Sequence, residues 1–165
     1  MLTKTGIPTQ ADLDSSWPSE EALDKGPVAV FECFQHIPCD PCHAACKFGA
    51  VQGFKDINDL PQVIHEKCNG CGACVTRCPG LAIFIVDRTY GETQGVVRLP
   101  FEYLPLPEVG EEVDALDREG NVVGVGRAVR VVKDPRLGTP VVWLAVDTTL
   151  LRTARNLRLR RGASA

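Results

Sequence analysis

The chain has 165 residues, of which 44% are hydrophobic and 24% are charged, and its formal net charge is -3. This composition excludes a largely disordered chain, and the acidic balance argues against a protein built mainly to bind nucleic acid. The longest apolar run, residues 81–86, is far shorter than the roughly 20 residues that a membrane-spanning helix needs. The N-terminus also lacks an apolar secretory signal, so we expect a soluble, cytoplasmic protein with no membrane span.

Residues 1–26 form an acidic N-terminal extension that Pro8 and Pro18 interrupt and that Pro27 follows. Ser19 precedes residues 20–23, whose sequence is EEAL, and this pattern predicts a helix N-cap followed by one short helical turn. Trp17 is a candidate anchor by which the extension packs onto a larger surface. An extended tail is the alternative.

Residues 27–88 contain every cysteine of the chain and show an approximate internal repeat. Each half consists of a strand, a cysteine loop, a short helix and a second strand. The expected strands are residues 28–32 and, more weakly, 50–54 in the first half, and residues 62–66 and 82–87 in the second half. We therefore predict an α+β domain whose two halves are related by a pseudo-twofold axis.

Residues 89–149 have a different composition, in which strand-like segments alternate with turn residues. The segments are 96–103, 112–116, 122–133 and 141–148. Their spacing predicts a small antiparallel β domain, either a sheet or a partly closed barrel. Its candidate core residues are Val122, Val125, Val129 and Val131. The region contains no histidine, no cysteine and no complete dinucleotide fingerprint, so we expect no reactive site in it.

Residues 150–165 form a basic C-terminal tail. Its arginines are Arg152, Arg155, Arg158, Arg160 and Arg161. Leucines and an alanine recur at helical spacing, which predicts a helix that frays toward the end of the chain. The alternative is a basic docking element for an acidic partner. Five arginines in an acidic chain are a weak signal for nucleic-acid binding.

The second cysteine set follows the pattern C-x2-C-x2-C-x3-C and is followed by proline. Its members are Cys68, Cys71, Cys74 and Cys78, with Pro79 after them. Three thiolates at this spacing surround one face of a cubane iron–sulfur cluster within a single tight loop. Gly70 and Gly72 allow backbone amides to approach the sulfurs and stabilise the negative charge of a cluster. The fourth cysteine lies past the loop, where the chain turns away, so it reaches a different cluster.

The first cysteine set departs from this pattern. Its members are Cys33, Cys39, Cys42 and Cys46, and Lys47 stands where the second set has proline. The position three residues before Cys39 is His36, and the nearest cysteine is three residues further upstream. Three interpretations compete. Cys33 is a ligand through a longer loop, His36 takes its place as imidazole does in Rieske centres, or neither binds and a three-iron cluster results. We favour Cys33 because thiolate is the usual ligand.

With these two cysteine sets, residues 28–87 resemble a bacterial-type two-cluster ferredoxin. In that family the last cysteine of each set binds the cluster of the other half. The resemblance therefore implies two [4Fe-4S] clusters as cofactors. Cluster I would be held by Cys33, Cys39, Cys42 and Cys78, with His36 as an alternative ligand, and cluster II by Cys46, Cys68, Cys71 and Cys74.

A cubane held by four thiolates has no open coordination position, so the expected function is electron transfer, and the chain alone has no catalytic residues. Almost 80 residues follow the cysteine region, which is typical of a subunit fixed in a larger oxidoreductase. The layout, including Glu32, Cys33 and residues 37–42, resembles small iron–sulfur subunits that accompany FAD-containing dehydrogenase subunits of amino-acid or opine type. This resemblance implies a flavin-containing partner in a hetero-oligomeric complex.

Other functions remain as alternatives. A diffusible ferredoxin would shuttle electrons between unrelated enzymes, and a structural zinc protein would use the C-x2-C pairs at Cys39 and Cys71. A disulfide framework is disfavoured because no secretory signal is present. His43 and His65 are expected to be solvated or packing residues, although His65 is close enough to Cys68 in sequence to tune a nearby cluster.

Overall fold

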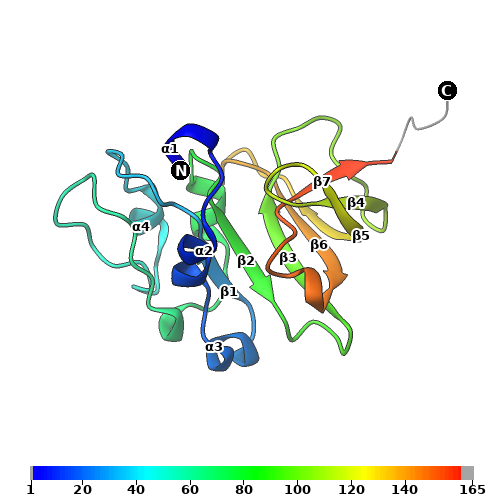
Figure 1. Ribbon diagram of the computed structural model, residues 1–165, viewed down its shortest axis with the longest axis horizontal. Coiled ribbons are helices and arrows are strands. Elements are labelled where there is room, and N and C mark those ends of the chain that lie inside the picture. Colours follow the sequence, from blue (N-terminus) through cyan, green and yellow to red (C-terminus); the bar gives the residue numbers. More distant parts are fainter. Residues whose placement is uncertain (1, 161–165) are drawn as a thin grey trace.

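The computed structural model describes residues 2–160, which form a mixed α+β fold around a seven-stranded antiparallel sheet (Figure 1). The strands are β1 (Val28–Phe31), β2 (Ile83–Asp87), β3 (Gln94–Pro100), β4 (Glu112–Leu116), β5 (Val122–Val132), β6 (Val141–Asp147) and β7 (Asn156–Leu159). They lie in the order β1-β2-β3-β6-β5-β4-β7. Because β2 pairs with β3, the sheet continues without a break from the cysteine region into the C-terminal part of the chain.

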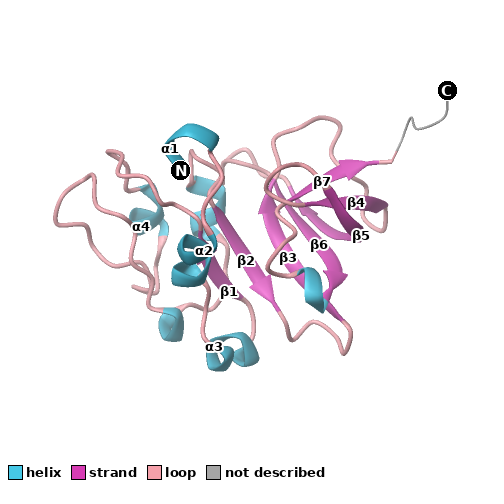
Figure 2. Ribbon diagram, viewed as in Figure 1, coloured by secondary structure: helices cyan, strands magenta, loops and turns pink. Residues whose placement is uncertain are grey.

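Short helices cover this sheet or connect its strands (Figure 2). They are α1 (Leu2–Thr5), α2 (Gln10–Ser16), α3 (Glu20–Lys25), α4 (Pro41–Ala45) and α5 (Ala73–Arg77), with 3-10 turns η1 (His65–Lys67) and η2 (Thr148–Leu150). In Figure 1 the cysteine loops and α4 lie on the left and β3–β7 on the right, with β1 and β2 between them. Among residues 2–160, no helix has both the length and the apolar character that crossing a membrane requires.

The strands β1 and β2 are buried on both faces, which explains why each is an uninterrupted apolar run. Since side chains alternate along a strand, one set points to each side of the sheet. Ala29, Phe31, Ile83 and Ile85 pack with the cysteines. Val28, Val30, Phe84 and Val86 pack into the larger core, which the C-terminal strands share. The same two strands therefore support the cysteine loops and join them to the rest of the molecule.

The N-terminal extension packs on this larger core. The hydroxyl oxygen of Ser19 accepts a hydrogen bond from the N–H of Ala22 at 3.2 Å, so the predicted cap and helical turn are confirmed in α3. Leu23 on this helix is fully buried. Trp17 packs against the core as predicted, and the guanidinium of Arg152 lies 5.0 Å from its ring centroid.

The predicted strands agree with β1 to β6 within a few residues, but the strands expected at residues 50–54 and 62–66 are wrong. Val63 forms only an isolated bridge with Val51, and the chain then enters the turn η1. The N–H of Cys68 donates to the carbonyl of His65 at 3.1 Å at the end of this turn. This tight turn places Cys68 at the start of the cysteine loop. If the strand continued instead, Cys68 would lie beyond this position.

The helix expected after residue 150 is also wrong. The chain forms η2 and then β7, which pairs with β4 in the register Ala115 with Leu157. Two arginines of the predicted basic tail bind acidic side chains of β4. Arg158 donates to Asp114 at 2.8 Å, and Arg160 donates to the same carboxylate at 2.7 Å. Pairing with an open strand edge therefore outweighs the helical spacing of the leucines. Arg161 lies outside the described residues.

The prediction that Val122 and Val125 of β5 are core residues is wrong as well. Val122 and Val125 are about half exposed, whereas Val131 packs against the core and Val129 is half-buried. The buried positions in the middle of β5 are Gly126 and Ala128. A Cβ atom on Gly126 would lie 2.6 Å from a methyl group of Leu144. The buried positions of β5 therefore carry small residues, because Leu144 of β6 fills the space beside Gly126.

The loop between β5 and β6 docks on the second cysteine segment. The N–H of Thr139 donates to the carbonyl of Thr76 in α5 at 3.1 Å, and the side chain of Arg77 donates to the carbonyl of Arg136 at 3.0 Å. Gly138 has a φ of +109°, and a Cβ atom there would lie 2.3 Å from the Thr76 carbonyl oxygen. This close approach holds the C-terminal strands against the helix that carries Cys74.

Candidate metal centre

The eight cysteines line two small cavities, four in each. The first cavity is lined by Cys33, Cys39, Cys42 and Cys78. The second cavity is lined by Cys46, Cys68, Cys71 and Cys74. Phe31 lines both, so the cavities are neighbours. Each cavity takes three cysteines from one sequence set and one from the other.

The two helices α4 and α5 explain this exchange of cysteines. They are five residues long, they pack against each other, and each has a cysteine at its second position, Cys42 or Cys74. Each also ends on a cysteine, because Cys46 is the C-cap of α4 and Cys78 is the C-cap of α5. The last cysteine therefore lies one helical turn beyond the second-position cysteine and lines the other cavity.

Backbone N–H groups point at several of the sulfurs. The N–H groups of Ala29 and Gly70 each donate to the sulfur of Cys68 at 3.4 Å, and Ala82 donates to Cys78 at 3.4 Å. Burial raises the pKa of Cys46, but hydrogen bonds from the backbone of residues 48–51 outweigh it and lower the pKa overall. Such donors stabilise thiolates and the negative charge of an iron–sulfur cluster.

The most buried thiols resist ionisation when no metal is bound. The pKa of Cys42 is raised to about 11, mainly by burial and to a smaller extent by neighbouring thiolates, Cys78 first among them. The pKa of Cys74 is raised to about 12, again mainly by burial, with smaller contributions from Cys68 and Cys71. The pKa of each of these two thiols is therefore affected by the other cysteines that line the same cavity. A metal that replaces the protons removes this repulsion, so the donor sets fit a thiolate-bound metal group.

These cavities fit a cluster better than a single ion. Among residues 2–160, no group of three or more histidine, cysteine or acidic side chains is placed to hold one metal ion. The four thiols of each set instead surround a space. A zinc site needs its ligands about 2.3 Å from one centre, whereas a cubane spreads its four ligand positions over four irons.

The histidines lie outside both cavity linings. His36 is exposed, and its Nδ1 lies 3.0 Å from the carbonyl oxygen of Asn58, whereas Cys33 lines the first cavity. His43 bonds to the carbonyl of Val51 through Nδ1 at 3.0 Å. Burial lowers the pKa of His65, which a hydrogen bond to the backbone of Ala29 partly opposes. The N–H of Ala29 in turn donates to the sulfur of Cys68, so His65 acts on the site only indirectly, through the backbone of Ala29.

A buried ion-pair network beside Cys33 was not apparent from the sequence. The carboxylate of Glu32 accepts hydrogen bonds from Arg118 at 2.6 and 2.7 Å and from Arg155 at 2.7 Å. Burial raises the pKa of Glu32, but the two guanidinium groups outweigh it and lower the pKa overall. Burial likewise lowers the pKa of Arg155 to about 10. The spacing of Glu32 and Arg155 in the sequence gives no indication that they form an ion pair, and the sequence placed Arg155 in a helix that frays into a solvated tail.

Comparison with known protein families places one match on this site. Residues 61–84 match the family described as the 4Fe-4S binding domain. The matched segment contains all four cysteines of the second set and ends within β2. Comparison with curated proteins and with solved structures gives no match. The family match supports an iron–sulfur protein of the ferredoxin type.

Two glycines of the second cysteine loop provide a matched test of the site geometry. Gly70 and Gly72 both have positive φ, but only at Gly70 would a Cβ atom collide, 2.5 Å from the carbonyl oxygen of Pro27. We expect Gly72→Ala to cost about 1–2 kcal/mol of unfolding free energy through backbone strain alone. Gly70→Ala should cost more and also lower the iron content, because the loop must shift at Cys68. Denaturant unfolding measures the stability of each variant, and iron analysis measures its iron content. Equal stability and equal iron content in the two variants would contradict the close approach of Gly70 to Pro27.

Proposed function

We propose that this chain holds two [4Fe-4S] clusters and relays single electrons between a donor and an acceptor. The observation that supports this most strongly is the arrangement of the cysteines, four around each of two neighbouring cavities. When bound, such clusters take up and release one electron at a time. The proposed ligands are Cys33, Cys39, Cys42 and Cys78 for cluster I, and Cys46, Cys68, Cys71 and Cys74 for cluster II.

The protein's own residues would hold the clusters and limit access of water to them. The apolar side chains of β1 and β2 form one wall of the site, with Phe31 between the two cavities. Backbone N–H groups at Ala29, Gly70 and Ala82 offset negative charge on the sulfurs. With every ligand position taken by a thiolate, the site carries electrons and has no place for an organic substrate.

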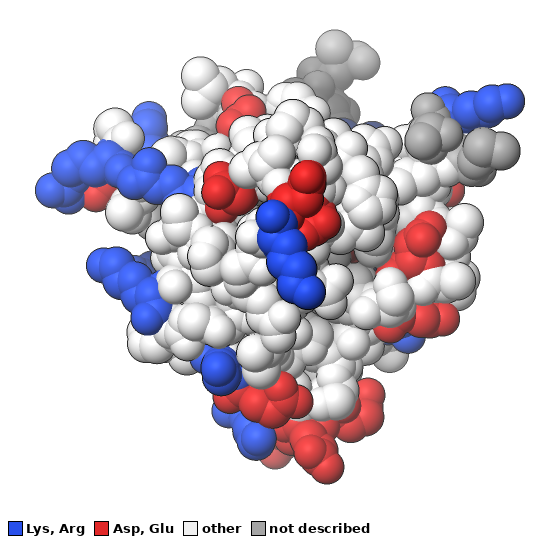
Figure 3. Space-filling model, turned by 90° about the vertical axis from the view of Figure 1, so that its left-hand side faces the viewer, with Lys and Arg blue, Asp and Glu red and all other residues white. Residues whose placement is uncertain are grey.

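We further propose that the chain works as a subunit beside a flavin-containing dehydrogenase subunit. Three exposed apolar side chains lie on the segment between β3 and β4, namely Tyr103, Leu104 and Val109. The face formed by the cysteine loops has large uncharged areas between scattered acidic and basic side chains (Figure 3). Exposed apolar side chains such as those of Tyr103, Leu104 and Val109 are typical of protein contacts. A diffusible ferredoxin is the second candidate, and it is favoured by the continuous sheet, with which the chain buries a core of its own.

Anaerobic purification of the native protein tests these proposals. We expect a brown preparation with the iron and labile sulfide that two cubane clusters require, eluting together with a chain that contains flavin. A stable species of the mass of a single chain, with both clusters, would support the shuttle instead. A colourless preparation containing zinc and no sulfide would refute electron transfer as the function.

The choice between Cys33 and His36 has a direct test. Cys33→Ala should lower the iron content or convert one cluster to a three-iron form, because the cavity loses a thiol. His36→Ala should keep the full iron content, because His36 lies outside the cavity and bonds to Asn58. Iron and sulfide analysis with electron paramagnetic resonance measures both variants, and loss of iron only in His36→Ala would show that the imidazole is the ligand.

A further inference from the structure

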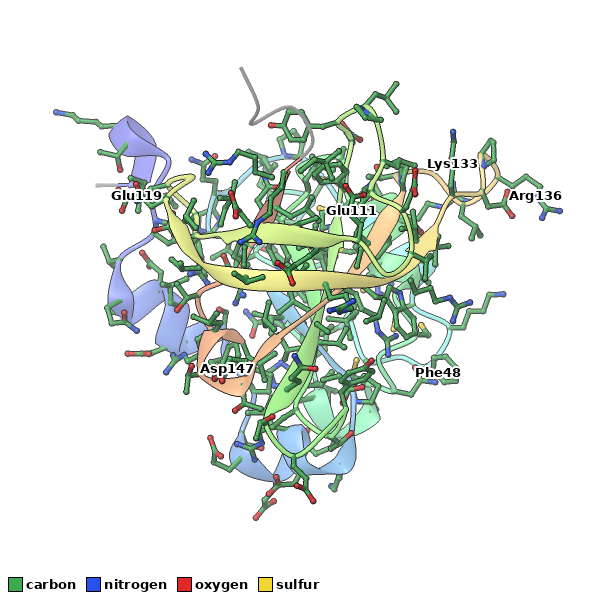
Figure 4. All side chains as sticks on the ribbon, turned by 90° about the vertical axis from the view of Figure 1, so that its right-hand side faces the viewer. Phe48, Glu111, Glu119, Lys133, Arg136 and Asp147 are labelled. Carbon is green, nitrogen blue, oxygen red and sulfur yellow. The ribbon has the colours of Figure 1, made fainter. Side chains whose placement is uncertain are left out.

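A large groove separates the second cysteine segment from the outer part of the sheet. It has a volume of about 880 Å³ and lies between α4 and α5 on one side and β3, β5 and β6 on the other, and the β5–β6 loop borders it. Cys71, the one exposed cysteine among residues 2–160, lies in its wall. Figure 4 shows Lys133 and Arg136 of the β5–β6 loop on the same side of the molecule as Phe48. Lys47 and Leu137, which neighbour these labelled residues in sequence, line the groove.

The groove is cationic although the chain as a whole is acidic. Its charged lining residues are Lys47, Arg77, Arg98 and Arg130, and no carboxylate lines it. Within the described part of the chain, none of these four side chains forms an ion pair, whereas most other arginines do. The Nε of Arg98 is buried and has no hydrogen-bond partner. The fold therefore gathers like charges here. The carboxylate of Asp87 offsets part of the charge on Arg98, and an anionic ligand would relieve the remaining repulsion.

The lining of the groove indicates what kind of anion fits. Trp143 is its one aromatic residue, and guanidinium groups already cover this ring, Arg98 at 3.7 Å and Arg130 at 4.8 Å from the centroid. The ring is therefore not free to stack on a nucleobase, which is how single-stranded nucleic acids and nucleotides are commonly held. Small and apolar side chains such as Ala44, Ala73 and Val141 form much of the remaining wall. They fit a polypeptide segment that carries both acidic and small apolar residues.

We propose that this groove binds an acidic segment of the redox partner protein and so brings the partner beside the cluster held by Cys71. This inference rests on the proposed electron-transfer function, because it assigns the docking surface that the function requires. Complementary charge speeds the encounter of electron-transfer partners, and it weakens as salt screens the charges. The partner should therefore present aspartate and glutamate side chains around its own redox centre.

A pair of double variants tests the groove on the purified protein with its clusters. Lys47→Gln with Arg130→Gln removes two exposed cations from the groove wall. Lys4→Gln with Arg127→Gln removes two exposed cations elsewhere and changes the net charge by the same amount. The probe is a short peptide of alternating glutamate and alanine, followed by isothermal titration calorimetry at low salt. We expect saturable binding that the groove variant weakens about tenfold and the control variant changes less than about twofold.

A second measurement uses small oxidants of opposite charge. The reduced protein gives one electron to each ferricyanide, which becomes ferrocyanide, or to each hexaammineruthenium(III), which becomes the ruthenium(II) complex. We expect the groove variant to react about fivefold more slowly with ferricyanide and no more slowly with the ruthenium complex. The control variant should match the wild type with both. A preparation without iron–sulfur clusters would refute the proposed function, which separates that failure from failure of the groove.

With the clusters present, four results would overturn the docking proposal. They are absence of peptide binding, equal peptide binding by the groove and control variants, tighter binding of a single-stranded oligonucleotide than of the peptide, and binding of pyrophosphate at the groove without any binding of the peptide. A ferricyanide rate that is the same in the groove variant and the wild type would also contradict it.

Discussion

Alanine at Cys46 and alanine at Cys74 are expected to remove the same iron–sulfur cluster, although the two residues belong to different sequence sets. Both line the second cavity, where Cys74 enters from the second position of α5 and Cys46 from the end of α4. Because a thiolate-bound metal contributes its binding free energy to folding, each variant should also unfold at lower denaturant concentration. Iron and sulfide analysis should show about half of the wild-type content, as expected when one of two equal clusters is lost.

The matched controls are Cys42→Ala and Cys78→Ala. Cys78 is only four residues from Cys74, yet it lines the first cavity together with Cys42. These two variants should therefore lose the other cluster, and the remaining paramagnetic resonance signal should differ from the one left in the first pair. If Cys74→Ala and Cys78→Ala instead leave the same signal, the ligand sets are not exchanged between the two halves, and the ligand assignment proposed above is wrong.

Arg155→Met is expected to destabilise the protein by about 3 kcal/mol, because it breaks a buried ion pair and leaves the carboxylate of Glu32 with one partner. The side chain of Arg155 is 3% exposed and that of Glu32 is 9% exposed, so water cannot replace the lost contact. Arg155 also donates to the carbonyls of Leu151 and Ala154 at 2.9 and 2.6 Å, and these bonds would be lost too. Denaturant unfolding with linear extrapolation measures the change.

The control for this variant is Arg158→Met in the same C-terminal segment. Arg158 pairs with Asp114 at the surface, where ion pairs contribute little, so the unfolding midpoint should stay nearly the same. A second readout is the rate at which a chelator removes iron. Because Glu32 precedes Cys33, Arg155→Met should speed iron loss from the first cavity and leave the second unaffected. Equal stability of Arg155→Met and wild type would show that the network contributes nothing to the fold.

The ion-pair network and the cationic groove have a common cause. Both arise where the C-terminal strands meet the cysteine region, since Arg155 reaches Glu32 while Arg98 and Arg130 face the wall that contains Cys71. In addition, the side chain of Arg98 donates to the carbonyl of Gly70 at 2.6 Å, within the second cysteine loop. The C-terminal part of the chain therefore supports the loops of the site and also supplies part of the positive charge beside one of the two cavities.

Much of the local structure follows from short-range patterns in the sequence. The spacing of Cys68, Cys71, Cys74 and Cys78 indicates an iron–sulfur loop, and the match of residues 61–84 to the 4Fe-4S binding domain supports it. Alternating or continuous apolar runs predicted β1 to β6, and Ser19 predicted the start of α3. These features depend on neighbours a few residues apart, so a sequence pattern is sufficient to reveal them.

Other features depend on contacts between residues far apart in the chain, and there the sequence was insufficient or misleading. The leucines after residue 150 have helical spacing, but the open edge of β4 and the carboxylate of Asp114 favour a strand. Val122 and Val125 looked like core residues, but the buried positions of β5 are Gly126 and Ala128, and Leu144 of β6 fills the space beside Gly126. Glu32 and Arg155 become partners only after the whole sheet has formed. The sequence by itself determined which cysteines form the candidate metal centre and, through the resemblance to two-cluster ferredoxins, the expected grouping of these cysteines. Only the tertiary structure decided which charges surround them, because burial and ion pairing depend on surfaces that come together only on folding.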